Sequence, residues 1–361
     1  MADASYEIAV FGSTPLAALL AGLLASEHHK RVCLIAEAGS AFRVPRGIDL
    51  SVMPVTRPET WALLKDTTAE TLRLLAQIRA KAGMQRVDPI FAADMPAGSE
   101  ALSHMRHVAM GFGYAVERLP SGAAFAAGDA YRLRDAVLLR RAEIEPLLAA
   151  WLEKAGVGQL AARDVGVTLR RDGTARIAYA GTNLEAAQAV LADDAAIVTY
   201  LEAPERDRTL ALHHVTALLT EPTHSLQAPV MIYPDRGVTL SRNRSGGVVA
   251  LGSGAPEIAL AQIGRCLTGR SPLRRAGQRI FRTVTTADGA PLVGPARGIK
   301  AVVIAGLGVG GAFLAPAVAR LIAGTASKKE QDYFAAREAG RGNARSLVAD
   351  YAGSISLEAQ V

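Results

Sequence analysis

A strand, a turn, a helix and a second strand near the start of the chain have the order of a unit that binds a dinucleotide. An apolar run over residues 8–11 ends at Gly12, an Ala- and Leu-rich stretch follows over residues 16–25, and a second apolar run over residues 32–35 leads to Glu37. In such a unit, the turn after the first strand binds a pyrophosphate through backbone N–H groups. The chemistry expected here is therefore the binding of a nucleotide cofactor.

The turn itself departs from the Gly-x-Gly-x-x-Gly pattern of these units. Gly12 keeps the first glycine, but Thr14 and Ala17 stand at the second and third glycine positions. Ala17 adds one methyl group where helix and strand approach, whereas Thr14 occupies the place where backbone meets pyrophosphate, and Pro15 removes an N–H donor there. Pro15 suits the first turn of a helix, and Ser13 or Thr14 could cap that helix or donate a hydroxyl to phosphate. We interpret the turn as an eroded nucleotide site.

A second glycine turn lies near the other end of the chain. The apolar residues 301–305 lead into residues 306–311, Gly-Leu-Gly-Val-Gly-Gly, and residues 315–324 then have a helical pattern. Glycines let backbone N–H groups approach a ligand, and the amino terminus of a helix stabilises negative charge. Alone, such a turn connects a strand to a helix without any ligand about as often as it contacts one. Together with the amino-terminal unit, it predicts contact with a cofactor.

The segments around the second turn carry a longer pattern. Residues 286–294, Thr-Ala-Asp-Gly-Ala-Pro-Leu-Val-Gly, precede the turn, and Ala315-Pro316 follows it. Together with the amino-terminal unit, they resemble the D-amino-acid-oxidase-like family of FAD-dependent amine oxidoreductases, which includes glycine oxidase, sarcosine oxidase and opine oxidase subunits. That family carries T-x-D-G-x-P-x-x-G, a buried strand and then G-x-G-x-x-G-x-x-x-A-P. The resemblance covers residues 6–324 as an order of elements, with its specific motifs at the two ends.

The resemblance implies FAD as the cofactor and assigns contacts to it. Glu37 stands where the family's acid binds the adenosine ribose, and Arg43 and Arg46 stand in the loop that touches phosphate or ribityl groups. The second glycine turn stands where backbone N–H groups face the pyrimidine edge of the flavin. The seven histidines form no metal-ligand spacing, so we assign no metal-binding residues. The cofactor-binding residues that we predict are Gly12, Ser13, Thr14, Ala17, Glu37, Arg43, Arg46, Gly306, Gly308, Gly310 and Gly311.

The substrate side is less well marked in the sequence. In the family, an arginine three positions before the motif threonine often binds the substrate carboxylate, but that position here is Thr283. Arg282 could serve through a local bulge or form a structural salt bridge, or the substrate is not a simple amino acid. Arg242 and Tyr233 lie on strands expected to face the flavin, where they could hold an anionic group or be plain sheet surface. We predict Arg282, Arg242 and Tyr233 as substrate-binding residues.

The resemblance implies oxidation of a C–N bond in an amine or amino acid, with hydride transfer to the flavin and an imine as the first product. This chemistry depends on positioning, so we assign no catalytic side chain. Two alternatives stay open. One is a flavin monooxygenase or dehydrogenase acting on a larger substrate, which the missing arginine at Thr283 favours. The other is a flavin-free subunit that acts as a scaffold or binding partner, which the Ser13-Thr14-Pro15 turn and the polar tail favour.

Helical and extended patterns alternate along the chain. Residues 133–157 have the apolar spacing of an amphipathic helix, and residues 165–181 predict a hairpin about Asp172-Gly173. The expected fold is α/β, with a Rossmann-like FAD-binding domain and an inserted substrate domain of mixed, mainly antiparallel sheet. We expect the FAD-binding domain to comprise residues 1–50, 130–200 and 295–327, the substrate domain residues 51–129 and 201–294, and a C-terminal tail residues 328–361.

Composition and charge argue against several other classes. The 361 residues are 50% hydrophobic and 20% charged, which is typical of a globular protein with a sizeable core. The formal charge of +6 comes from scattered arginines without a basic stripe, so we expect no nucleic-acid partner. The uncharged residues 301–319 are interrupted by glycines and a proline, so we expect no membrane span.

The expected surroundings of the protein follow from its cysteines and its termini. Cys33 and Cys266 form no metal or disulfide pattern, and the start of the chain lacks a basic leader. We therefore expect a cytoplasmic protein whose partner is a small-molecule amine or amino acid. The tail after Lys328 could be a contact arm for a protein partner or a second copy of the chain, or a loosely ordered terminus.

Overall fold

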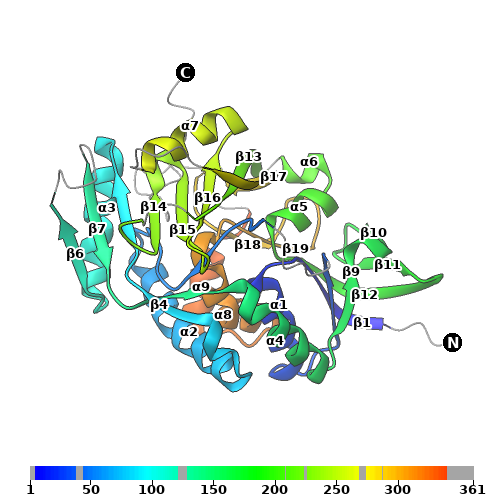
Figure 1. Ribbon diagram of the computed structural model, residues 1–361. Coiled ribbons are helices and arrows are strands. Elements are labelled where there is room, and N and C mark those ends of the chain that lie inside the picture. Colours follow the sequence, from blue (N-terminus) through cyan, green and yellow to red (C-terminus); the bar gives the residue numbers. More distant parts are fainter. Residues whose placement is uncertain are drawn as a thin grey trace.

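The computed structural model describes residues 5–37, 44–120, 128–207, 209–222, 226–267, 274–286 and 288–339. Within these residues, the strands form two large sheets and one small sheet, with helices packed around them (Figure 1). The first large sheet lies at the right of Figure 1 and the second at the left. The predicted α/β class, with a parallel sheet and a separate, mainly antiparallel sheet, is confirmed.

The first sheet has a parallel centre. β1 (Ser5–Phe11) pairs in parallel with β2 (Val32–Ala36) and β12 (Thr182–Leu191), β2 pairs with β9 (Gly158–Ala161), and β12 pairs with β19 (Val302–Ala305). The antiparallel strands β10 (Val165–Leu169), β11 (Ala175–Tyr179) and β18 (Leu292–Pro295) complete it. Because parallel strands end at the same edge, the residues that follow β1, β2, β12 and β19 meet at one edge of this sheet.

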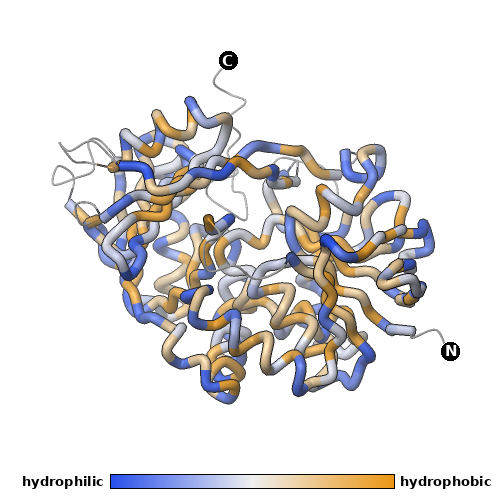
Figure 2. The backbone as a smooth tube through the Cα atoms, turned by 45° about the vertical axis from the view of Figure 1, so that its right-hand side comes forward, coloured by the Kyte–Doolittle hydropathy of each residue, from blue (hydrophilic) through white to orange (hydrophobic). Residues whose placement is uncertain are grey.

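Alternating side chains of β1 pack into two separate cores. Ile8 and Val10 are buried with α1 (Pro15–Ser26) and α8 (Gly311–Ala323), whereas Ala9 and Phe11 are buried with α5 (Asp194–Tyr200). α1 also packs tightly on α4 (Arg141–Lys154), since a Cβ on Gly22 would lie 2.2 Å from the ring of Trp151. Figure 2 shows the hydrophobic residues concentrated on these inner elements and the hydrophilic ones in the outer loops.

The second sheet has the strand order β17-β13-β16-β15-β14-β5-β7-β6, and only β14 and β5 pair in parallel. One face packs on the main core through Phe91, Tyr131 and Ile232, and the other, which carries Met231 and Tyr233, packs with α7 (Pro256–Cys266). The strands are β5 (Ile90–Ala93), β6 (Val116–Leu119), β7 (Asp129–Leu133), β13 (Leu210–Thr220), β14 (Val230–Tyr233), β15 (Val238–Arg242), β16 (Val248–Ser253) and β17 (Arg275–Thr286).

A small antiparallel sheet joins β8 (Ala136–Leu139) to β3 (Asp49–Leu50) and β4 (Met84–Val87). The prediction of one helix over residues 133–157 is wrong in its first part. The end of β7 and the whole of β8 occupy that part, and α4 begins only at Arg141. The remaining helices are α2 (Pro58–Gln77), α3 (Pro96–Gly111), α6 (Ala203–Arg206) and α9 (Lys328–Ala335), with 3-10 turns η1 (Ala80–Gly83), η2 (Ala162–Asp164), η3 (Pro234–Arg236) and η4 (Gly308–Gly310).

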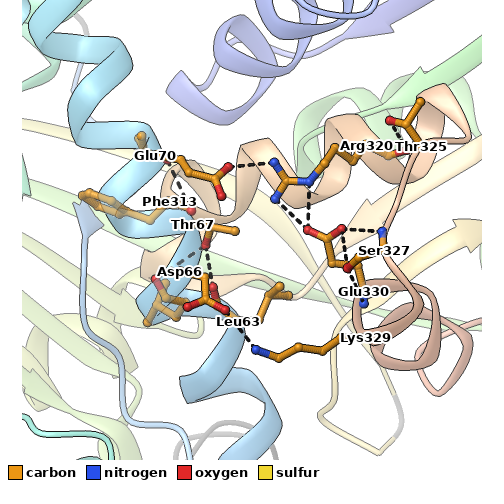
Figure 3. A network of polar contacts seen from close by, with 12 residues as sticks. Leu63, Asp66, Thr67, Glu70, Phe313, Arg320, Thr325, Ser327, Lys329 and Glu330 are labelled. Atoms are coloured by element: carbon orange, nitrogen blue, oxygen red, sulfur yellow. Dashed lines mark hydrogen bonds and ion pairs between the residues drawn. The ribbon is translucent and has the colours of Figure 1, made fainter.

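Charged residues tie α9 to α2 and α8 (Figure 3). Arg320 of α8 donates to Glu330 of α9 at 2.6 Å and to Glu70 of α2 at 2.7 Å. Glu330 also forms a capping box with Ser327, and Lys329 pairs with Asp66 of α2 at 2.9 Å. The first part of the expected tail is therefore a docked helix, while residues 340–361 lie outside the described part of the chain.

Among the described residues, no single helix is long and apolar enough to cross a membrane. Residues 308–323 and α9 reach that length only as a pair, and the pair is bent by 95°. The assignment of sequence ranges to domains stays a prediction. β7, at residues 129–133, belongs to the second sheet although most of the range 130–200 lies with the first.

Candidate functional site

A cleft of about 670 Å³ lies between the two large sheets. One wall is made by residues that follow β1, β2, β12 and β19, and the other by β17 and Leu251 of β16. Its volume is within the range of ligand-binding pockets. Seven of the predicted site residues line it, namely Thr14, Glu37, Arg46, Gly306, Gly308, Gly311 and Arg282.

The amino-terminal turn has used most of its hydrogen-bonding groups within the protein. The backbone N–H of Ser13 donates to Oδ2 of Asp193 at 2.6 Å, and Oγ1 of Thr14 accepts from the N–H of Ala17 at 3.4 Å. Pro15 occupies the first position of α1 and has no N–H. Thr14 and Leu16 line the cleft, and neither backbone N–H has a hydrogen-bond partner among the described residues. These two N–H groups and the Thr14 hydroxyl are therefore donors of this turn that could reach a ligand.

Gly12 and Ala17 shape this turn from within. Gly12 has φ +154°, and a Cβ there would lie 3.0 Å from the Cβ of Ala17 and 3.1 Å from the Cγ of Asp193. Glycine is therefore needed for close packing as well as for its backbone angle. Gly12, Ser13 and Ala17 hold the turn in place, but they are not among the residues that line the cleft.

Asp193 links three elements at the carboxyl end of β12. Besides Ser13, its carboxylate accepts the backbone N–H of Ala196 at 2.8 Å and so caps α5. Burial raises the pKa of Asp193, and the hydrogen bonds from Ser13 and Ala196 act in the opposite direction. The carboxyl group of Asp193 thus lies beside the turn where the sequence predicts pyrophosphate. Asp193 is not among the site residues predicted from the sequence.

Glu37 and Arg46 form an ion pair at the end of β2. Nη2 of Arg46 lies 2.5 Å from Oε1 of Glu37, and the backbone N–H of Glu37 donates to Oγ of Ser13 at 2.8 Å. Nε of Arg46 is buried and has no hydrogen-bond partner among the described residues. A buried donor without an acceptor is costly, so this atom indicates a place for an external acceptor. Arg43 lies outside the described residues.

The second glycine turn faces the cleft directly. Gly306 and Gly308 have φ +71° and +55°, values that favour glycine, and both line the cleft with Gly311. Gly310 points elsewhere, since a Cβ there would lie 2.3 Å from the Cε of Met53. The N-cap residue of α8 makes no side-chain cap, and its first turn carries no acid. This end of α8 therefore presents backbone N–H groups and a positive dipole end to a ligand.

Strand β17 does not have the bulge that would bring Arg282 to the position of Thr283. Its pairing with β13 is regular opposite residues 210–219, and the register shifts only between Leu219 and Thr220. The hydroxyl of Thr283 donates to Asp194, whereas strand alternation directs the Arg282 side chain to the opposite face of β17, although Arg282 is among the residues that line the cleft. Burial raises the pKa of Asp194 to about 6, although the bond from Thr283 lowers it.

The structure does not bring Tyr233 and Arg242 to the cleft. Tyr233 is buried on the face of the second sheet that packs with α7, and burial raises its pKa. Arg242 lies on the same face by strand alternation, and its Nη2 donates to the carbonyl of Leu226 at 2.5 Å. Which sheet face packs with α7 depends on tertiary contacts, and the strand sequences alone did not show it.

Three residues of β17 and α4 line the cleft but were not predicted as site residues from the sequence. Arg279 and Phe281 line the cleft on β17, and Arg141 lines it from the start of α4, where it pairs with Asp49 at 2.8 Å. Strand alternation would have placed Arg279 and Phe281 on the face of Thr283, had the strand been predicted as regular. Nothing in the sequence around Arg141 distinguishes it from other surface arginines.

Comparison with known proteins supports the fold. No protein-family model and no curated protein matches the sequence. The structure is similar to iminodiacetate oxidase from Chelativorans sp. BNC1 (17% identity, 88% of this chain and 94% of that chain, TM-score 0.64). It is also similar to L-proline dehydrogenase from P. horikoshii (15% identity, 92% of this chain and 97% of that chain, TM-score 0.67). A third similar structure is glycine oxidase from Geobacillus kaustophilus (16% identity, 95% of this chain and 97% of that chain, TM-score 0.66). These likenesses confirm the resemblance to the D-amino-acid-oxidase-like family at the level of the fold.

Proposed function

We propose that this chain, which has the fold of the D-amino-acid-oxidase-like family, is an FAD-dependent oxidoreductase that oxidises a C–N bond of a small amine. The observation that carries the proposal is the second glycine turn, which presents Gly306, Gly308 and Gly311 to a cleft whose opposite wall is β17. Backbone N–H groups and a helix amino terminus thus lie beside a space large enough for a ligand. The structural neighbours, named as oxidases or a dehydrogenase, support the same class.

Two features of the cleft fit FAD and one opposes it. The buried Nε of Arg46, without a partner among the described residues, suits a phosphate or ribose oxygen. The uncapped start of α8 suits the pyrimidine edge of a flavin, where reduction places negative charge. Against these, the carboxyl group of Asp193 uses the Ser13 N–H and lies near the expected pyrophosphate. We infer that FAD fits the cleft, with its weakest contacts at the amino-terminal turn.

The chain's residues would bind and position both ligands. When bound, FAD supplies an acceptor for a hydride from the carbon next to an amine nitrogen, which leaves an imine that water hydrolyses. Glu37 would accept hydrogen bonds from ribose hydroxyls, and Arg46 would offset phosphate charge. The start of α8 would hold the ring edge, and β17 would position the amine. Because the nitrogen must lack its extra proton to form the imine, positioning of the neutral amine contributes more than a side-chain base.

Two other candidates have observations in their favour. A flavin-free binding protein is favoured by the Asp193–Ser13 hydrogen bond, which removes a donor that a pyrophosphate would need. A flavin monooxygenase or dehydrogenase acting on a larger substrate is favoured by Thr283, which stands in place of an arginine and binds Asp194. The first candidate predicts no flavin in the protein. The second predicts flavin that amines do not reduce.

The visible absorption spectrum of the purified, untagged protein separates these candidates. We expect a flavin spectrum, FAD as the cofactor released on denaturation, and bleaching of the spectrum when a substrate amine is added without oxygen. A protein that stays colourless after incubation with excess FAD contradicts the proposal and supports a binding protein. A flavin that is bound but not reduced by any amine in a broad screen favours the larger-substrate enzyme.

A further inference from the structure

The cleft-facing side of β17 carries Arg279, Phe281 and Thr283, which are spaced two residues apart. Arg279 lies opposite Ala217 of β13, and Ala217 lies opposite Leu251 of β16. Residues directly opposite each other on neighbouring strands point to the same face of a sheet. Leu251 and the three β17 residues therefore share one face, and all four line the cleft.

The Thr283 end of this row is acidic. The Thr283 hydroxyl donates to Asp194, and Asp193 precedes Asp194 at the start of α5. A substrate carboxylate placed beside Thr283 would meet the Asp194 carboxylate, and two like charges in contact repel. This end therefore favours a nitrogen that is positively charged or donates hydrogen bonds.

The Arg279 end of the row is basic. Of the other arginines that line the cleft, Arg46 pairs with Glu37 and Arg141 with Asp49, while the side chain of Arg282 is directed to the opposite face of β17. Arg279 has no ion-pair partner in the described part of the chain, and its side chain is exposed. A guanidinium that faces a cleft without a counter-charge is suited to bind a carboxylate or phosphate.

We propose that the cleft takes an elongated amine, with its nitrogen toward Asp194, an apolar segment along Phe281 and an anionic group on Arg279. Four residues of a strand span roughly 13 Å, so the two ends lie too far apart for an α-amino acid, which carries both groups on one carbon. That the ligand is oxidised rests on the proposed function. Anion binding by Arg279 does not depend on it.

The test is a binding series measured by isothermal titration calorimetry on the full chain equilibrated with FAD. The ligands are glycine, 4-aminobutanoate, 6-aminohexanoate and 8-aminooctanoate, with hexylamine as the amine that lacks an anion. We expect the longer amino acids to bind at least about tenfold more tightly than either glycine or hexylamine, because only they reach both ends. Phosphonate analogues of the best ligand then show whether carboxylate or phosphate is preferred.

Three variants assign the anion contact. Arg279→Gln should remove the preference for 6-aminohexanoate over hexylamine, and Arg279→Lys should restore part of it. Arg275→Gln is the control, because Arg275 lies on the same strand but opposite Thr220, past the register shift, bonds Gln278 and does not line the cleft. Thermal unfolding of each variant checks that it folds.

Several outcomes overturn the inference. They are an unchanged preference in Arg279→Gln, loss of the preference in Arg282→Gln instead, and no binding of any member of the series to the unaltered protein. Reduction of bound flavin by the same ligands is followed separately. Binding that depends on Arg279 without flavin reduction would support the inference while contradicting the proposed oxidation.

Discussion

The carboxylate of Asp193 accepts the backbone N–H of Ser13 at 2.6 Å and the backbone N–H of Ala196 at 2.8 Å. One side chain thus connects the turn after β1 to the start of α5. The bond joins residues 180 positions apart and places a carboxyl group at the edge of the cleft. The rigidity of the nucleotide turn and its affinity for an anion therefore depend on the same residue.

Replacing Asp193 should show how much its hydrogen bonds stabilise this junction. Asp193→Ala leaves the N–H groups of Ser13 and Ala196 without their acceptor, so we expect a loss of roughly 2 kcal/mol in the free energy of unfolding. Asp193→Asn keeps only one of the two acceptor oxygens and turns its NH2 group toward the other N–H donor, so we expect it to cost about 1 kcal/mol, less than Asp193→Ala. Urea unfolding of both variants provides the measurement. Equal losses in the two variants would show that the charge, and not the hydrogen bonds, stabilises this junction.

Asp194 should make stability depend on pH. Burial raises its pKa to about 6 from an ordinary value of 3.8. The folded state then binds a proton more tightly than the unfolded state, so this contribution to stability is complete below about pH 4 and is lost as the pH rises through about 6. Asp194→Asn keeps a partner for Thr283 without the charge. It should be more stable than the unaltered protein at pH 7 by up to roughly 3 kcal/mol, and no more stable near pH 4.

The measurement is urea unfolding from about pH 4 to pH 8. Asp164→Asn is the control, because its carboxylate is largely exposed, with a side chain that is 52% accessible. A difference between Asp194→Asn and the unaltered protein that stays constant over this range would contradict the assignment of the titration to Asp194.

The contacts of α9 predict a contrast between a shielded and an exposed ion pair. Arg320→Met leaves the Glu330 carboxylate, whose side chain is 7% accessible, without its guanidinium, so we expect a loss of about 3 kcal/mol. Lys329→Gln removes a pair whose two side chains are each 58% accessible and should cost less than about 1 kcal/mol. Thermal and urea unfolding measure both. A loss from Lys329→Gln as large as that from Arg320→Met would contradict this account.

Local sequence signals predicted some elements correctly. The hairpin about Asp172-Gly173 is confirmed by β10 and β11, because the turn requires a positive φ and Gly173 has +89°. The strand, glycine turn and helix near the carboxy terminus are confirmed by β19, η4 and α8. In each case a glycine that permits an unusual backbone angle marks the change of direction.

Other features depend on tertiary contacts and could not be predicted from local sequence. Residues 136–139 continue a helical pattern but form β8, because they pair with residues 84–87 of β4. Tyr233 and Arg242 were predicted at the substrate, yet packing of α7 makes theirs the outer face of the second sheet. No sequence motif includes Asp193 and Asp194. Their roles in the site depend on hydrogen bonds from Ser13 and Thr283, which are distant in sequence.

Restoring the nucleotide turn should strengthen FAD binding. Thr14→Gly combined with Pro15→Ala returns the second glycine and adds an N–H at the first position of α1. One hydrogen bond to a charged phosphate contributes about 1.5 to 3 kcal/mol, so we expect FAD to bind at least about tenfold more tightly. Quenching of flavin fluorescence on titration gives the dissociation constant. Pro58→Ala is the matched control, because Pro58 also begins a helix, α2, but does not line the cleft. Unchanged affinity in the double variant would mean that the Asp193 carboxylate, rather than the missing donor, limits FAD binding.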